Sequence, residues 1–223
     1  MPADKTTAAT GLLTASNRIA WSGRVLGVQP RIDLMRSFDE RTHSYLGYLL
    51  VLDGNVDGVA RQFTVRIGPG MQAKHAIHAG DLLAGVAHLP ADPAREAADI
   101  YRASGLRFEA RGPEPSPAGP PWTMLPPLLE TYRQRGHRRL DARTFDAKCR
   151  SCTWGCRMAV EIIIDQWAPD RREHRFETFC YGPRSCPSYR PGPMRKVPGR
   201  KGMSWTEEDW VDEDATAHRH ADE

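Results

Sequence analysis

Two apolar segments joined by a glycine-rich turn decide the fold: Ser44-Tyr-Leu-Gly-Tyr-Leu-Leu-Val-Leu52, the turn Asp53-Gly-Asn-Val-Asp-Gly58, and Gln62-Phe-Thr-Val-Arg-Ile67. The first segment is apolar on both faces, whereas the second alternates apolar and polar residues with the period of two of a half-buried strand. Turns rich in Gly, Asn and Asp join the strands of hairpins. The stretch therefore predicts a β-hairpin. The whole chain agrees, since 19 Gly and 18 Pro in 223 residues favour short strands and turns.

Similar segments lie on both sides of this hairpin. Leu26–Leu34 alternates apolar and polar residues and predicts a strand before it. Gly68-Pro69-Gly70 ends the second hairpin strand, and Met71–Ala79 is long enough for about two turns of helix. Leu82–Leu89 and Tyr101–Ala110 predict two further strands. The expected order is strand, strand, strand, short helix, strand, strand.

This order resembles the OB-fold, a five-stranded Greek-key barrel, over residues 22–110. The helix at 71–79 and the Gly80-Asp81 pair before the fourth strand carry the resemblance. It is a resemblance of pattern, and another small β-barrel would fit the same pattern. The expected fold class is mainly β, an OB-like barrel of five strands followed by a small α+β module that is rich in cysteine and binds a metal.

The five cysteines all lie late in the chain, in the spacing Cys149-x2-Cys152-x3-Cys156 followed by Cys180-x5-Cys186. Two thiolates separated by two residues can bind one ion, and a second pair from a distant turn completes a tetrahedron. With two predicted strands between the pairs, residues 147–190 resemble a zinc ribbon, although the x5 gap is wider than usual. A module of about 60 residues buries too little surface to be stable alone, so we expect the metal to be structural.

Zinc and an iron–sulfur cluster both fit these cysteines. The simplest zinc set is Cys149, Cys152, Cys180 and Cys186, with Cys156 as an alternative ligand. A [4Fe–4S] cluster also takes four thiolates, and Cys-x2-Cys-x3-Cys followed by a later Cys-Pro is typical of cluster spacing. Zinc is the expected cofactor and the cluster is the alternative.

The chain divides into five predicted parts by composition. Residues 1–20 form a disordered tail and 21–111 the barrel, while 112–127, with seven prolines, form a linker. Residues 128–203 form the metal-binding module with basic flanks, and 204–223 an acidic tail.

The net charge of +3 conceals two basic blocks and an acidic end. Residues 133–150 hold seven Lys or Arg against two Asp, and 184–201 hold six with no acid. Arginines interleaved with aromatic residues suit phosphate binding and base stacking. OB-folds bind single strands across strands two and three, which implies a binding role for the first loop and the third strand. The expected nucleic-acid contacts are Arg36, Phe38, Arg41, Arg66, Arg195, Lys196, Arg200 and Lys201.

We therefore predict a protein that binds nucleic acid, most simply single-stranded DNA or RNA, and carries a structural zinc. The alternatives are an iron–sulfur or redox protein and an adaptor that binds protein partners through the acidic tail with Trp205 and Trp210. Motifs of common enzymes are missing, among them Gly-x-Ser-x-Gly and His-Glu-x-x-His, so catalysis is not favoured. No apolar run reaches the ~20 residues that span a bilayer and no secretory signal begins the chain, so the cytoplasm is the expected location.

Overall fold

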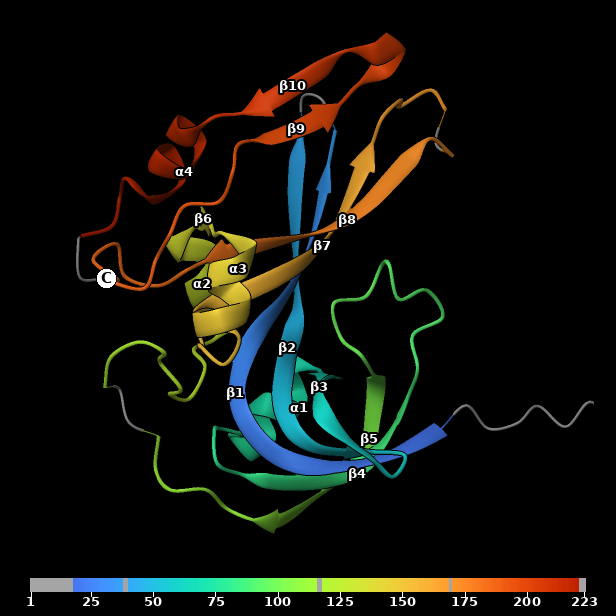
Figure 1. Cartoon of the computed structure of the whole chain (residues 1–223), viewed down its shortest axis with the longest axis vertical. Helices are drawn as coiled ribbons and strands as arrows, with labels where there is room; N and C mark the ends of the chain where they lie inside the picture. Colours follow the sequence, from blue (N-terminus) through green and yellow to red (C-terminus); the bar gives the residue numbers. More distant parts are fainter. Residues whose placement is uncertain (1–17, 38–39, 116–117, 169, 221–223) are drawn as a thin grey trace, which may run out of the picture.

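The protein is mainly β, with one open sheet that runs through most of the chain (Figure 1). The computed structural model describes residues 18–37, 40–115, 118–168 and 170–220. The elements in the first half are β1 (Arg18–Arg36), β2 (Arg41–Val56), β3 (Val59–Ile67), α1 (Pro69–His75), β4 (Leu82–His88) and β5 (Tyr101–Ala110). Those in the second half are α2 (Leu129–Arg135), β6 (Arg138–Arg139), α3 (Ala142–Thr144), a π-helical turn (Phe145–Cys149), β7 (Gly155–Ile163), β8 (Arg172–Cys180), β9 (Arg195–Pro198), a 3-10 turn (Arg200–Gly202), β10 (Ser204–Glu207) and α4 (Asp209–Thr216).

The predicted hairpin is confirmed, and its turn is tighter than the sequence indicated. β2 and β3 are antiparallel from Tyr48↔Ile67 to Val56↔Val59, so only Asp57 and Gly58 form the turn. Both have positive φ, 50° and 81°, as a two-residue hairpin turn of the primed kind requires. The strands after the helix are also confirmed, in β4 and β5.

The first five strands pair in the order β3-β2-β1-β4-β5, and this sheet is open. Its two end strands come near each other through an isolated parallel bridge between Val65 and Ile100. There the amide of Arg66 donates to the carbonyl of Ile100, and the amide of Ile100 donates to the carbonyl of Thr64, at 3.0 and 3.1 Å. These strands do not close a barrel, and the OB-like barrel of five strands stays a prediction.

β1 connects the two halves of the molecule. Its first part pairs with β4, from Arg18↔His88 to Arg24↔Leu82, and its last part pairs in parallel with β7, from Asp33↔Ala159. One sheet thus contains strands from both sides of the predicted linker at 112–127. The described residues of this linker form no helix or strand. In Figure 1, β1 and β2 curve around the lower part of the molecule and then run upward to β7 and β8.

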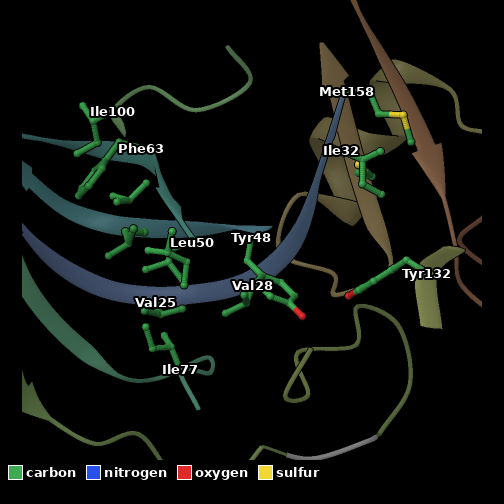
Figure 2. Packing of buried hydrophobic residues seen from close by; sticks show 14 of the residues in the cluster. Val25, Val28, Ile32, Tyr48, Leu50, Phe63, Ile77, Ile100, Tyr132 and Met158 are labelled. Atoms are coloured by element: carbon green, nitrogen blue, oxygen red, sulfur yellow. The ribbon is translucent and has the colours of Figure 1, made fainter. Parts of the chain in front are cut away.

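One apolar core follows this curved sheet. Figure 2 shows Leu50, Phe63 and Ile100 packed within the curve, and Ile32 of β1 and Met158 of β7 farther along the same core. Members of this core from both halves are fully or almost fully buried. Burial of large apolar side chains therefore stabilises the two halves as one unit.

A buried ion network closes the upper part of the molecule. The guanidinium of Arg36, 1% exposed, donates to Glu177 and to Glu207, each at 3.1 Å. Arg41 pairs with Glu207 at 2.7 Å, and Arg195 pairs with Glu177 at 3.0 Å. Part of the predicted acidic tail is thus the ordered strand β10, which is held on the sheet by arginines.

The final helix is held in a similar way. Asp212 of α4 accepts from the guanidinium of Arg139 at 2.8 Å and from its backbone amide at 3.0 Å. Asp209 also pairs with Arg139. No helix in the described part of the chain is long and apolar enough to cross a membrane.

Glu207→Gln tests the ion network. Burial alone would raise the pKa of Glu207, but Arg36, Arg41 and Arg195 outweigh it and hold the pKa below its ordinary value of 4.5. Near pH 7 the variant should lose about 3 kcal/mol of unfolding free energy, because Arg36 stays buried with one partner fewer. The stabilisation is complete above pH 4.5 and is lost as the pH falls through the lower folded value, so wild type and variant should converge in acid.

Urea unfolding near pH 7 and in acid measures both effects. Glu130→Gln is the matched control, because it removes an exposed pair with Arg133 that should contribute less than about 1 kcal/mol. Equal losses in the two variants would contradict the role of the network.

Candidate functional site

Three of the five cysteines lie in one buried cluster beside the end of β8, and a fourth lies near them. Cys149, Cys152 and Cys180 are buried in one cluster, with exposed fractions of 8%, 6% and 6%. Cys186 is partly exposed and close enough to these thiols to raise their pKa values. These are the four cysteines of the simplest predicted zinc set.

Cys156 lies apart from this group. Along β7, Gly155 is opposite Cys180 and Cys156 is opposite Phe179, so the side chain of Cys156 points to the other face of the sheet. It is fully buried in the main core, and its thiol donates to the carbonyl of Pro30 at 3.4 Å. Burial raises the pKa of this thiol, as for an inert core residue.

Residues 149–152, the first knuckle, rest on β1. The side-chain amide of Gln29 donates to the carbonyls of Cys149 and Cys152 at 2.8 and 3.0 Å. Gly27 lies under the same turn, where an added Cβ would come within 2.0 Å of the carbonyl oxygen of Ser151. Only glycine fits at this position, and a 2% exposed glutamine fixes the turn from below.

Backbone amides point at two of the sulfurs. Amides of Trp154 and Trp122 donate to the sulfur of Cys152, and the amide of Gly182 donates to the sulfur of Cys180 at 3.3 Å. In each knuckle one donor therefore comes from the residue two positions after the cysteine. Donors of this kind favour the thiolate form.

Residues 180–186, the second knuckle, are surrounded by arginines. Arg135 donates to the carbonyl of Tyr181 at 2.8 Å, and Arg219 donates to the carbonyls of Tyr181 and Gly182, both at 3.1 Å. Arg138 donates to the carbonyl of Pro183 at 2.9 Å. Basic side chains from α2, β6 and the end of the chain thus fix the second knuckle.

Without a cation, the thiols of Cys149 and Cys152 are neutral near pH 7. Burial and the neighbouring cysteines raise the pKa of Cys149 to about 12, and burial raises that of Cys152 to about 11. A bound cation would reverse this and release protons. Among the described residues, no group of three or more His, Cys, Asp or Glu side chains could hold a metal ion as it stands.

The predicted nucleic-acid contacts lie in different environments. Arg36 and Arg195 are buried in the ion network, 1% and 9% exposed. Arg41 is paired with Glu207 within the same network. The sequence could not indicate this, because the acidic partners of Arg36 are 141 and 171 residues away. Phe38 lies outside the described residues.

The other predicted contacts are more accessible. Lys196, Arg200 and Lys201 are exposed, and Arg200 lies 3.7 Å from Asp165. Arg66 is half-exposed and paired with Glu96 at 3.2 Å.

The outer face of β2 and β3, where the OB-like pattern predicts binding, is partly covered. Leu49 is 2% exposed beneath Ala97 and Ala98, which belong to the connection between β4 and β5. In the same connection Asp99 accepts from the amide and hydroxyl of Thr64, at 2.7 and 2.9 Å. The part of this face that stays open lies beside the first knuckle.

Two adjoining hollows, here named the basic groove, begin at this opening. The first, about 450 Å³, lies between β2–β3 and the first knuckle and includes Lys148 and Arg150. The second, about 560 Å³, includes Arg157 and Lys196. Asp146 lines both. Within the second hollow the Arg157 guanidinium stacks 4.1 Å from the ring of Phe176, which also lines it.

Sequence analysis did not single out Arg157 or Phe176 as binding residues. Side chains alternate between the two faces of a strand, so Arg157 points away from the core that contains its neighbours Cys156 and Met158. This alternation is the signal that could have identified Arg157 as a surface residue. The groove is formed by segments that are far apart in the sequence, and local sequence patterns do not show that these segments lie together.

Comparison with known proteins gives no relatives: no family model, curated protein or solved structure matches this chain.

Gln29→Met tests the hydrogen bonds that hold the first knuckle on β1. The substitution keeps the volume but leaves the carbonyls of Cys149 and Cys152 without the donor, which should cost about 1–3 kcal/mol of unfolding free energy for each carbonyl left unpaired. Thermal unfolding measures the loss, and Gln62→Met, on the exposed part of β3, is the matched control. A stability equal to that of the control would show that the first knuckle does not depend on β1.

Proposed function

We propose that this protein binds single-stranded nucleic acid along the basic groove, with a structural zinc held by Cys149, Cys152, Cys180 and Cys186. The observation that carries the proposal is the meeting of exposed basic side chains from separate segments around two connected hollows. The first contains Lys148 and Arg150, and the second contains Arg157 and Lys196.

The chemistry of such a groove favours a flexible polyanion. Lys and Arg side chains neutralise phosphates, and half-exposed aromatic rings stack on bases in proteins that bind single strands. Phe176 is the half-exposed ring of this groove, and Val51 adds an apolar part to its wall. We place residues 22–110 in the proposal as an OB-like barrel, supported by the strand order, the helix between β3 and β4 and the bridge from β3 to Ile100.

The proposed zinc fits the donor set. Four thiols without histidine or carboxylate are typical of structural zinc, whereas catalytic zinc keeps an open position for water. The four side chains would have to turn inward to ligate the ion, since they do not form a preformed site. We keep the cytoplasm as the proposed location, where thiols stay reduced.

The iron–sulfur alternative loses its main support from the position of Cys156. Its spacing argument uses Cys156 as the third ligand, but this thiol points to the other face of β7. The adaptor alternative relied on two tryptophans, of which Trp205 packs against the core and Trp210 is 58% exposed. Zinc and nucleic acid therefore remain the favoured pair.

The proposal predicts binding that falls steeply with salt. Replacing four side chains by Ala removes four cations from the groove: Lys148, Arg150, Arg157 and Lys196. Each phosphate contact contributes ~0.7 to the slope of log affinity against log salt, so the magnitude of this slope should decrease by roughly 3. Fluorescence anisotropy with a labelled single-stranded oligonucleotide at several salt concentrations measures it.

A matched control replaces four exposed cations that line neither hollow: Arg18, Arg24, Lys74 and Arg107. The control should keep the slope of the wild type. Equal slopes in the two quadruple variants would contradict the groove, and a wild type that binds no oligonucleotide at low salt would contradict the function itself.

A further inference from the structure

Two arginines at the second knuckle, Arg138 and Arg219, have buried N–H groups without an acceptor in the described part of the chain. Arg219 is 5% exposed, and its Nε and Nη2 atoms are buried without a hydrogen-bond acceptor. The Nε of Arg138 is in the same situation. Among the described residues the side chains of both arginines donate to carbonyl groups and not to a carboxylate.

An arginine without a counter-ion is costly to bury. Desolvation opposes its charge, and each buried N–H without an acceptor adds to the cost. Burial, followed by the nearby charges of Arg135 and Arg138, lowers the pKa of Arg219 to about 10. The surroundings of the second knuckle therefore require negative charge, which the described carboxylates do not supply.

The cysteines are placed to supply it. Arg138 is opposite Cys180 in the pairing of β6 with β8, and its side chain lies within hydrogen-bonding reach of the sulfur of Cys180. Four thiolates around a divalent cation carry a net charge of −2, and each thiol releases its proton to solvent when the ion binds. Two guanidinium groups would neutralise this charge.

We propose that Arg138 and Arg219 are the counter-charges of a four-thiolate metal centre, and that the metal thereby fixes the C-terminal segment 204–219 on the protein. The inference rests on the proposed zinc centre and adds two positioning residues to it. Arg219 follows α4, so its contact with the second knuckle links that helix to the cysteines. Without the ion, the buried positive charges would have no counter-charge. The contact between Arg219 and the second knuckle would then be weaker, and segment 204–219 would be held less firmly.

The alternative source of negative charge is a bound anion such as phosphate. An anion would satisfy the same donors without deprotonating any thiol. The two are separated by loading the protein with zinc alone or with phosphate alone.

Hydrogen exchange of the full wild-type chain is the first test. Amides of residues 209–219 should exchange more slowly in the zinc-loaded protein than in the chelator-treated protein. Exchange that is the same in both states would overturn the coupling. Protection by phosphate without zinc would overturn the metal as the source of charge.

Arg219→Gln is the second test, with Arg190→Gln as the matched control. Arg190 is exposed and donates only to the nearby carbonyls of Pro187 and Tyr189. Competition with a chelator should show zinc binding weakened by about 10–100-fold in Arg219→Gln and unchanged in the control, since partners outside the ligand shell contribute this much. Arg219→Lys, which keeps the charge, should recover part of the affinity.

Cobalt substitution separates a positioning role from loss of the site. Arg219→Gln should keep the thiolate-to-cobalt absorption bands of the wild type, because all four ligands remain. Unchanged zinc affinity, or loss of these bands, would overturn the role of Arg219. A wild type that binds neither zinc nor cobalt would instead contradict the proposed metal centre itself.

Discussion

Strand β1 is long enough to pair with strands in both halves of the molecule. Its 19 residues pair with β2 and β4 at one end and with β7 at the other, so one strand belongs to both halves of the sheet. The first knuckle rests on the middle of this strand, above Gly27 and Gln29. Fixing one strand therefore fixes the outer face of β2 and β3, the cysteines and the basic groove between them.

Arginine side chains are buried at two places, the ion network and the second knuckle. In the ion network, Arg36 is surrounded by carboxylates that come from β8 and β10, and its charge is balanced. At the second knuckle, Arg138 and Arg219 are not balanced by any described carboxylate. This contrast accounts for the pairing of Glu207 with Arg36 and Arg41. It is also the reason why we propose thiolates as the partners of Arg138 and Arg219.

Local patterns predicted much of the fold and part of the site. Alternation and turn residues predicted β2, β3 and β4, and spacing singled out cysteines of which Cys149, Cys152 and Cys180 lie in one buried cluster. Sequence could not show that Arg195 is buried and paired with Glu177, or that Asp99 accepts hydrogen bonds from Thr64, because these contacts join distant segments. The position of Cys156 follows from a register between β7 and β8 that only the folded sheet defines.

Elemental analysis of the purified protein, together with its absorption spectrum, distinguishes zinc from iron at the cysteines. We expect one zinc per chain and no visible absorption, a stoichiometry that Cys156→Ser keeps and that Cys152→Ser lowers. Iron with a visible absorption band, lost in Cys156→Ser, would contradict this expectation, and so would a folded protein that holds no metal.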